Sequence, residues 1–395
     1  MKKSLLAVAV IGAFASAAQA QSSVTVYGTL DYSFGTTKYE NIGGSTAASK
    51  QTTSNGINRG GTANGALTSN RIGFRGVEDL GGGNKALFNI EYGFSGSTDT
   101  NDGAAANALT TTAAREANVT LETKQLGSLK AGYGTTLIHA MLTADRAQGG
   151  TNMPGDILYT SDSTSSADNR IHANMVRSSG LTYYVPQIIP GLVVAAAFGS
   201  DNTYSDGATN NSSRSGSRNI QGSARYTIGA FTIGGAMATA VTNVAEVTGV
   251  SATTSVTAQV LAVAAAETKY SVNAVSTAYT YGPVKVDAVY AQRTSTNNLT
   301  GAQTGKVSGT QAGVKYTVTP VIYVTGAYGV GKVETTAANV ADKDTSGYLL
   351  SAVYDLSKRT NLYLAYGTQA MKYKQSAGQP VEKITTTALG MRHTF

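Results

Sequence analysis

The chain has 395 residues and a formal net charge of +7, and only 13% of its residues are charged. That charged fraction is low for a soluble surface. The Lys and Arg residues do not form the clusters that are typical of nucleic-acid binding, so no nucleic-acid partner is expected. The chain has no Cys, so an exported form would lack disulfides and would depend on hydrogen-bonded closure or oligomerisation. After residue 20, no apolar run reaches the length of about 18 residues that a transmembrane helix needs.

The N-terminal segment has the pattern of a cleaved export signal. Lys2 and Lys3 give a basic start, an apolar run follows, and Ala18-Gln19-Ala20 supplies the small residues of a cleavage site. The run is too short to cross a membrane as a helix. The sequence therefore predicts a signal peptide over residues 1–20 and a single domain over residues 21–395.

The rest of the chain alternates apolar and polar residues, which is the period of a β-strand. Near the start, Val24 and Val26 alternate with Thr25 and Tyr27. Short turns alternate with longer stretches rich in Ser, Thr, Asn and Gly. Sixteen strands are predicted, and an even count lets both chain ends meet at the short-turn end of a closed barrel. The predicted strands cover residues 22–35, 69–78, 85–95, 115–123, 128–134, 177–186, 191–199, 218–228, 231–240, 267–281, 284–294, 308–318, 321–331, 346–355, 360–371 and 383–395.

The last predicted strand alternates to the final residue, Phe395. A terminal strand of this kind suits a closed membrane barrel, because it must pair with the first strand while its outer face meets lipid. A soluble secreted β-sandwich or β-helix is the alternative that alternating strands alone leave open. Two stretches fit the pattern badly. Residues 261–266 are too apolar for a solvated loop, and residues 191–199 are apolar on both faces, as expected beneath a folded-in loop.

Several stretches resemble the Gram-negative general porins of the Neisseria and Burkholderia type. They are Ser23–Gly28, Ser69–Gly83, Arg115–Val119, Tyr354–Thr360 and Leu389–Phe395. The resemblance covers both ends and much of the middle of the chain. It implies an all-β fold, a 16-stranded antiparallel transmembrane β-barrel with a long third loop folded into the lumen. It also implies a homotrimer in the outer membrane and passive diffusion of small polar solutes.

Strand parity assigns residues to the predicted lumen wall. If Ile72 and Phe74 face lipid, then Arg71 and Arg75 face water. A narrow aqueous pore focuses such charge, so a weak anion preference is expected. Arg71, Arg75 and Lys130 are the predicted constriction wall. Further inward cations are Arg225, Lys285, Lys315 and Arg392, and the inward carboxylates are Asp31, Glu91, Glu116 and Asp287.

The long stretch 135–176 is the predicted constriction loop, whose acids could oppose the arginines of the wall. Porins of this group usually carry a Gly-Arg pair at the end of the fifth strand, where this chain has Gly132-Tyr133. Lys130 or Arg146 could replace that arginine. The charged loop residues are Asp145, Arg146, Asp156, Asp162, Asp168 and Arg170.

No motif indicates chemistry on a substrate. Without Cys, the three histidines, His139, His172 and His393, offer too few ligands for a structural zinc site. No nucleophile-elbow motif is present. The glycines at 81–83 lack the Gly-Lys-Ser/Thr of a phosphate-binding loop, and the loop aspartates lack EF-hand spacing. No cofactor, metal or enzymatic activity is expected.

The sequence thus predicts a general diffusion porin in the Gram-negative outer membrane, exported by its signal peptide. The expected partners are the lipid bilayer, two further copies of the chain, small hydrophilic solutes and anions, and the barrel-assembly machinery, which would bind the strand that ends at Phe395. A substrate-specific channel of the same architecture is the first alternative. An outer-membrane barrel enzyme and an adhesin without an open lumen are the others.

Overall fold

A computed structural model gives the fold of most of the chain. The predicted signal peptide at residues 1–20 and the ambiguous stretch 261–266 lie outside the described residues. The structure describes residues 23–41, 52–57, 65–94, 113–148, 152–158, 171, 175–206, 212–243, 267–336, 342–374 and 381–395.

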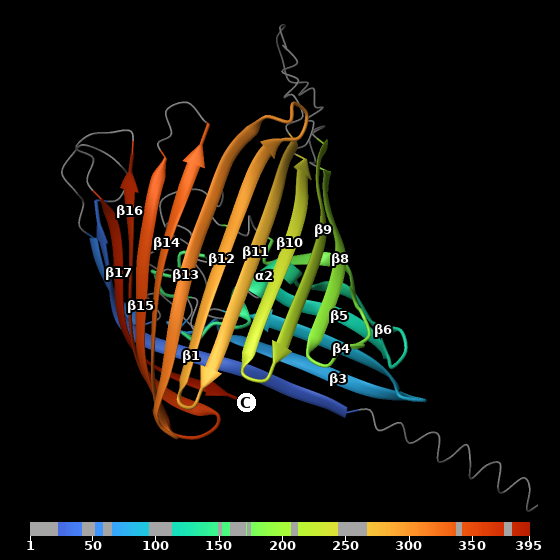
Figure 1. Ribbon diagram of the computed structural model, residues 1–395, viewed down its shortest axis with the longest axis horizontal. Helices are drawn as coiled ribbons and strands as arrows, with labels where there is room; N and C mark the ends of the chain where they lie inside the picture. The colour runs from blue at the N-terminus through green and yellow to red at the C-terminus, as the bar shows by residue number, and fades with distance from the viewer. Residues whose placement is uncertain are drawn as a thin grey trace, which may run out of the picture.

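Sixteen antiparallel strands form a closed barrel, as the alternation predicted, with the short turns gathered at one end (Figure 1). A further strand, β2 (Thr52–Ile57), pairs with the later part of β1. The strands of the ring are β1 (Ser23–Glu40), β3 (Arg71–Gly81), β4 (Asn84–Gly93), β5 (Ala113–Thr123), β6 (Gly127–Thr135), β7 (Arg177–Tyr184), β8 (Leu192–Asp206), β9 (Ser212–Ile228), β10 (Phe231–Asn243), β11 (Glu267–Tyr281), β12 (Val284–Asn297), β13 (Gln303–Thr319), β14 (Ile322–Thr335), β15 (Lys343–Asp355), β16 (Thr360–Tyr373) and β17 (Glu382–Thr394).

Closure joins the first strand to the last. β1 pairs with β17 from Thr29 opposite Thr394 to Glu40 opposite Lys383. Beyond that ladder, the N–H of Gly28 donates to the carbonyl of Phe395 at 3.1 Å, and the N–H of Phe395 donates back at 3.2 Å. Each strand of the ring therefore has two neighbours, which satisfies the backbone groups that an open edge would leave exposed.

Several strands run further toward the long connections than the sequence predicted. β1 continues to Glu40 rather than residue 35, and β8 continues to Asp206 rather than residue 199. The prediction of a long connection over 295–307 is wrong, because β12 ends at Asn297 and β13 begins at Gln303. The Ser, Thr and Asn side chains in these ends resemble loop composition, but backbone pairing with the neighbouring strand does not require apolar side chains.

The two faces of the sheet differ as a membrane barrel requires. On β1, Val24 and Phe34 are 65% and 63% exposed, whereas Thr29, Asp31 and Ser33 are buried. Large exposed apolar side chains continue around the outside, while charged and polar side chains point inward. This alternation suits lipid outside and water inside. Among the described residues, no helix is long and apolar enough to cross a membrane.

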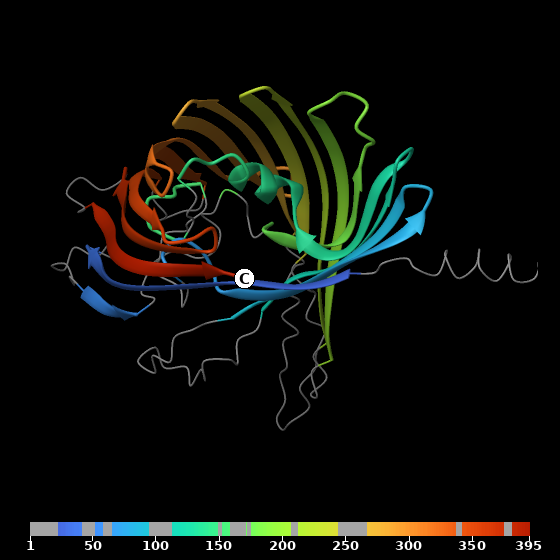
Figure 2. The ribbon, with the colours of Figure 1, turned by 90° about the horizontal axis from the view of Figure 1, so that it is seen from below.

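A short helix, α2 (Leu137–Thr143), lies on the inner side of the ring (Figure 2). The hydroxyl of Thr136 caps its N-terminus by accepting the N–H of His139 at 3.3 Å. Ile138 and Leu142 are fully buried and belong to an apolar cluster with alanines of β10 and β11. The sequence predicted loop at this helix, because seven residues are too few to show a helical period.

Candidate functional site

The inner wall near β3, β4 and β5 holds a compact group of charges. Ile72 and Phe74 of β3 are exposed on the outside, so Arg71 and Arg75 lie on the inner face. The Arg71 guanidinium nitrogen Nε lies 3.7 Å from Oε2 of Glu91 on β4. Strand parity thus placed both arginines on the correct face, because the register of β3 is regular through this stretch.

Glu91 is the centre of this group. Its Oε1 accepts Nε of Arg115 at 2.5 Å, and its Oε2 accepts the hydroxyl of Tyr27 at 3.1 Å. The Arg75 guanidinium lies 5.2 Å from the centre of the Tyr27 ring, a cation–π contact. One carboxylate therefore serves two arginines, while Arg75 has an aromatic ring in place of a carboxylate.

Arg115 is a wall residue that sequence reasoning missed. The β4–β5 register shifts between Glu91 and Tyr92, where Glu116 and Ala114 are their partners, and this bulge lets Arg115 and Glu116 both point inward. Glu116 accepts the N–H and the hydroxyl of Thr135 at 2.9 and 2.6 Å. Strict alternation assigns neighbouring residues to opposite faces, so only the bulge reveals the second inward charge.

The segment after α2 is fastened to the wall by consecutive residues. Asp145 accepts two hydrogen bonds from Arg225 of β9, at 3.0 and 2.5 Å. Arg146 forms an ion pair with Asp156, and both side chains are almost fully buried. The N–H of Ala147 donates to Oδ1 of Asp287 on β12 at 2.7 Å. These three partners come from different parts of the chain and hold the turn between them.

Amide side chains of the wall bind the same segment at two further points. The N–H of Ile138 donates to Gln221 of β9, and the N–H of Ile157 donates to Gln311 of β13, each at 3.2 Å. Asn152 donates to the carbonyl of Gly65 at 2.8 Å. The described parts of residues 136–158 are thus held against the inner wall. The other predicted loop charges, Asp162, Asp168 and Arg170, lie outside the described residues.

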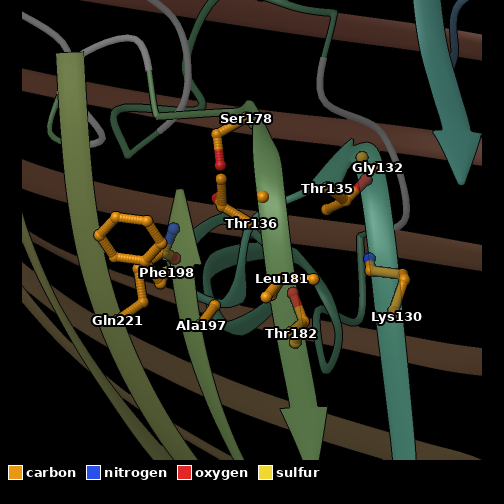
Figure 3. A pocket seen from close by; sticks show the side chains of 12 residues that line it. Lys130, Gly132, Thr135, Thr136, Ser178, Leu181, Thr182, Ala197, Phe198 and Gln221 are labelled. Atoms are coloured by element: carbon orange, nitrogen blue, oxygen red, sulfur yellow. The ribbon is translucent and has the colours of Figure 1, made fainter. Parts of the chain in front are cut away.

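A hollow lies beside Lys130 on the inner side of β6 (Figure 3). Gly132, Gly180 and Gly199 stand opposite one another on β6, β7 and β8, and this row of glycines contributes no side chains of its own to the wall. Figure 3 shows the hydroxyl-bearing side chains of Thr136 and Ser178 at one end of the hollow. Lys130 and Gly132 both line this hollow, whereas the other predicted replacement for the missing arginine, Arg146, is buried in its ion pair with Asp156.

Of the three histidines, two lie in the described residues. His139 is on α2, and His393 of β17 lies 2.8 Å from the hydroxyl of Thr360. His172 lies outside the described residues. Within the described parts of the chain, no group of three His, Cys, Asp or Glu side chains could hold a metal ion. The described chemistry is that of a charged and hydrogen-bonding wall.

Comparison with known proteins gives one family. A profile of the Gram-negative porin family matches residues 7–373. An outer membrane porin protein of Bordetella pertussis is 43% identical over 96 residues, which are 24% of this chain and 25% of that protein. Outer membrane porin protein 32 of Delftia acidovorans is 41% identical over 91 residues, 23% of this chain and 22% of that protein. The alignment thus spans about a quarter of the length of each of these curated relatives.

Solved structures resemble the whole barrel. The anion-selective porin from Comamonas acidovorans has a TM-score of 0.64 at 21% identity, with 95% of this chain and 100% of that chain covered. The trimer form of OmpT from Vibrio cholerae has a TM-score of 0.58 at 14% identity, with 95% and 99% covered. These likenesses show the fold.

Proposed function

The chain belongs to the Gram-negative porin family, and on this premise we propose that it forms a water-filled channel for passive diffusion of small hydrophilic solutes and ions. Its place is the outer membrane of a Gram-negative bacterium. The proposal depends on one observation. The barrel is closed, its outer face is apolar, and its inner face bears several charges that have no ion-pair partner among the described residues. Charges on an inner face need water, since an unpaired charge in a dry interior is strongly unfavourable.

The wall arginines and the fastened loop segment would form the constriction. Arg71, Arg75 and the newly recognised Arg115 supply the basic side, and Lys130 extends it along the wall. Asp145 is held by Arg225 and would bring a carboxylate to the edge of the loop. We assign Arg146 and Asp156 to bracing the loop, because their buried ion pair leaves neither side chain to meet a solute.

A weak anion preference follows from how the carboxylates are used. Glu91 serves Arg71 and Arg115, and Asp145 serves Arg225. In the described residues, Arg75 and Lys130 have no ion-pair partner. Asp31, Glu116 and Asp287 also face inward without an ion pair, but the inward cations outnumber the inward carboxylates, and low-dielectric walls focus the net positive field on passing ions.

The outer surface and the last strand suggest how the barrel is assembled. By analogy with the OmpT trimer, we propose a homotrimer embedded in lipid through the exposed apolar side chains of the strands. Phe395 is 40% exposed and completes the backbone pairing with Gly28. We propose that this residue and its strand are also the element that the barrel-assembly machinery recognises.

Single-channel recording in a planar bilayer tests the proposal. The folded protein should insert with stable conductance in three equal steps, and reversal potentials in a KCl gradient should show chloride to be more permeant than potassium. Heat-unfolded protein is the control for adventitious leaks. Absence of conductance steps would refute the channel, and strong cation selectivity would refute the assignment of the wall. Conductance that saturates with one solute would indicate the substrate-specific alternative.

A further inference from the structure

Two lysines face each other on the inner wall, far round the ring from the arginine group. Lys285 of β12 stands directly opposite Lys315 of β13 in the strand register. Both lie toward the short-turn end of their strands, since β12 begins at Val284 and β13 ends at Thr319. Like charges directly opposite one another destabilise a sheet. The repulsion between the two lysines therefore indicates either a functional role for the pair or a bound anion that offsets it.

Tyr323 of β14 draws a third cation into the same place. Nζ of Lys315 lies 3.8 Å from the centre of the Tyr323 ring, which is close for a cation–π contact. Arg392 on β17 lies near enough to the phenol of Tyr323 for its charge to act on that group. A single aromatic side chain thus holds an ammonium group on its face and has a guanidinium group nearby.

Three nearby carboxylates act on this group without forming ion pairs with it: Asp31 acts on Arg392, Asp287 on Lys285 and Asp355 on Lys315. Asp31 stands opposite Arg392 in the register, but it accepts the Tyr363 hydroxyl at 2.5 Å and the N–H of Thr68 at 2.7 Å. Asp287 accepts a backbone N–H from the loop segment. Asp355 at the end of β15 is the carboxylate whose charge acts on Lys315. Within the described chain, none of the three cations has a carboxylate oxygen at ion-pair distance.

We propose that Lys285, Lys315 and Arg392, held by Tyr323, form a docking site for a small multivalent oxyanion of the phosphate type at the periplasmic mouth of the lumen. A tetrahedral dianion can accept hydrogen bonds from two ammonium groups and one guanidinium group at once. Its charge offsets the repulsion between the opposed lysines, which a monovalent chloride does less well. The site rests on the proposed function in one respect only, since it requires a water-filled lumen.

Lysine footprinting tests the site without measuring ion flow. The folded protein in detergent is acetylated with an amine-reactive ester in inorganic phosphate or in KCl of equal ionic strength, and each lysine is followed by mass spectrometry. We expect phosphate to slow acetylation of Lys285 and Lys315 several-fold and to leave Lys130 on β6 unchanged. Arg392→Gln should raise the phosphate concentration that gives half protection about tenfold, the effect of losing one hydrogen bond to a charged group. Lys358→Gln, at an exposed position in the turn between β15 and β16, is the control and should not change it.

The outcomes separate the site from the channel. Equal protection of all three lysines would overturn the proposal, since it would show only a general ionic effect. Protection by succinate but not by phosphate would overturn the ligand class. A protein that conducts ions but shows no protection refutes the site alone, and protection without conductance refutes the channel alone. Should Arg392→Gln fail to fold, Lys285→Gln replaces it, and loss of protection at Lys315 is then the expected result.

Discussion

Replacing Glu91 by Gln is the sharpest test of how the wall sets selectivity. Glu91 accepts Arg115 at 2.5 Å and Tyr27 at 3.1 Å, and it lies 3.7 Å from Arg71. Glutamine keeps the shape and one acceptor oxygen but removes the negative charge. The wall then carries one more uncompensated positive charge, so we expect the anion preference to increase.

The size of the effect follows from Coulomb's law. A unit charge about 8 Å from a permeating ion contributes roughly 0.5 kcal/mol at the dielectric constant of water and roughly 1 kcal/mol at half that value. Because the charge favours chloride and disfavours potassium by the same amount, the two energies add, and the ratio of chloride to potassium permeability should rise about five- to thirtyfold at low salt. Salt screens the interaction, and at about 1 M ionic strength the Debye length of about 3 Å should remove most of the gain.

The assay is the reversal potential of Glu91→Gln in a KCl gradient, measured at low and at high salt. Glu78→Gln is the matched control, because Glu78 is an exposed carboxylate on the same outward face of β3 as Ile72 and Phe74. The control should match the unmodified protein. If Glu91→Gln gave the same reversal potential as Glu78→Gln, or shifted it toward cations, Glu91 would not face the ion path and the assignment of the wall would fail.

Three further substitutions test separate parts of the site. Arg75→Gln should lower the chloride-to-potassium permeability ratio by a similar factor at low salt, because Arg75 has no carboxylate partner in the described residues. An unchanged reversal potential would contradict this. Ile138 is fully buried, so Ile138→Ala should lower the free energy of unfolding in detergent micelles by about 2–5 kcal/mol. Ile138→Val should lower it by only about 0.5–1.5 kcal/mol. Equal losses in the two variants would argue against a packed helix. Arg225→Gln should leave Asp145 buried without its ion-pair partner, so that this contact no longer holds the loop and the noise of the open-channel current increases. Noise equal to that of the unmodified protein would show that this contact does not hold the loop.

Strand parity predicted the faces of the barrel because lipid outside and water inside impose a strict period of two residues. Val24 and Phe34 face outward while Asp31 faces inward, and a slip of one residue would exchange them. The ends of the strands were less predictable. Near the long connections no apolar face is needed, so composition resembles loop even where backbone pairing continues, as it does to Asp206 in β8.

The details of the site depend on contacts that no local pattern contains. Asp145 and its partner Arg225 are 80 residues apart, and Arg146 and Asp156 are 10 residues apart in a stretch without a period. Nothing in the sequence distinguishes a loop acid that meets solutes from one that is buried in an ion pair. Arg115 is hidden for a different reason, since one bulge reverses the parity on which the prediction of the wall depends.

The uncompensated cations of the described lumen lie toward one end of the barrel. Arg75 is in the middle of β3, on the short-turn side of Arg71, Lys130 is near the start of β6 at Gly127, and the phosphate-type site is also at the short-turn end. The ion-paired Arg71 and Arg115 lie further toward the long connections, whereas Arg225, which is paired with Asp145, lies near the short-turn end of β9. We therefore expect the current through the channel to be larger at one polarity at low salt, because anions accumulate at the periplasmic mouth. The asymmetry should vanish at about 1 M salt and shrink in Lys285→Gln. A symmetric current–voltage curve at low salt would show that the positive electrostatic field is not stronger at one end of the lumen.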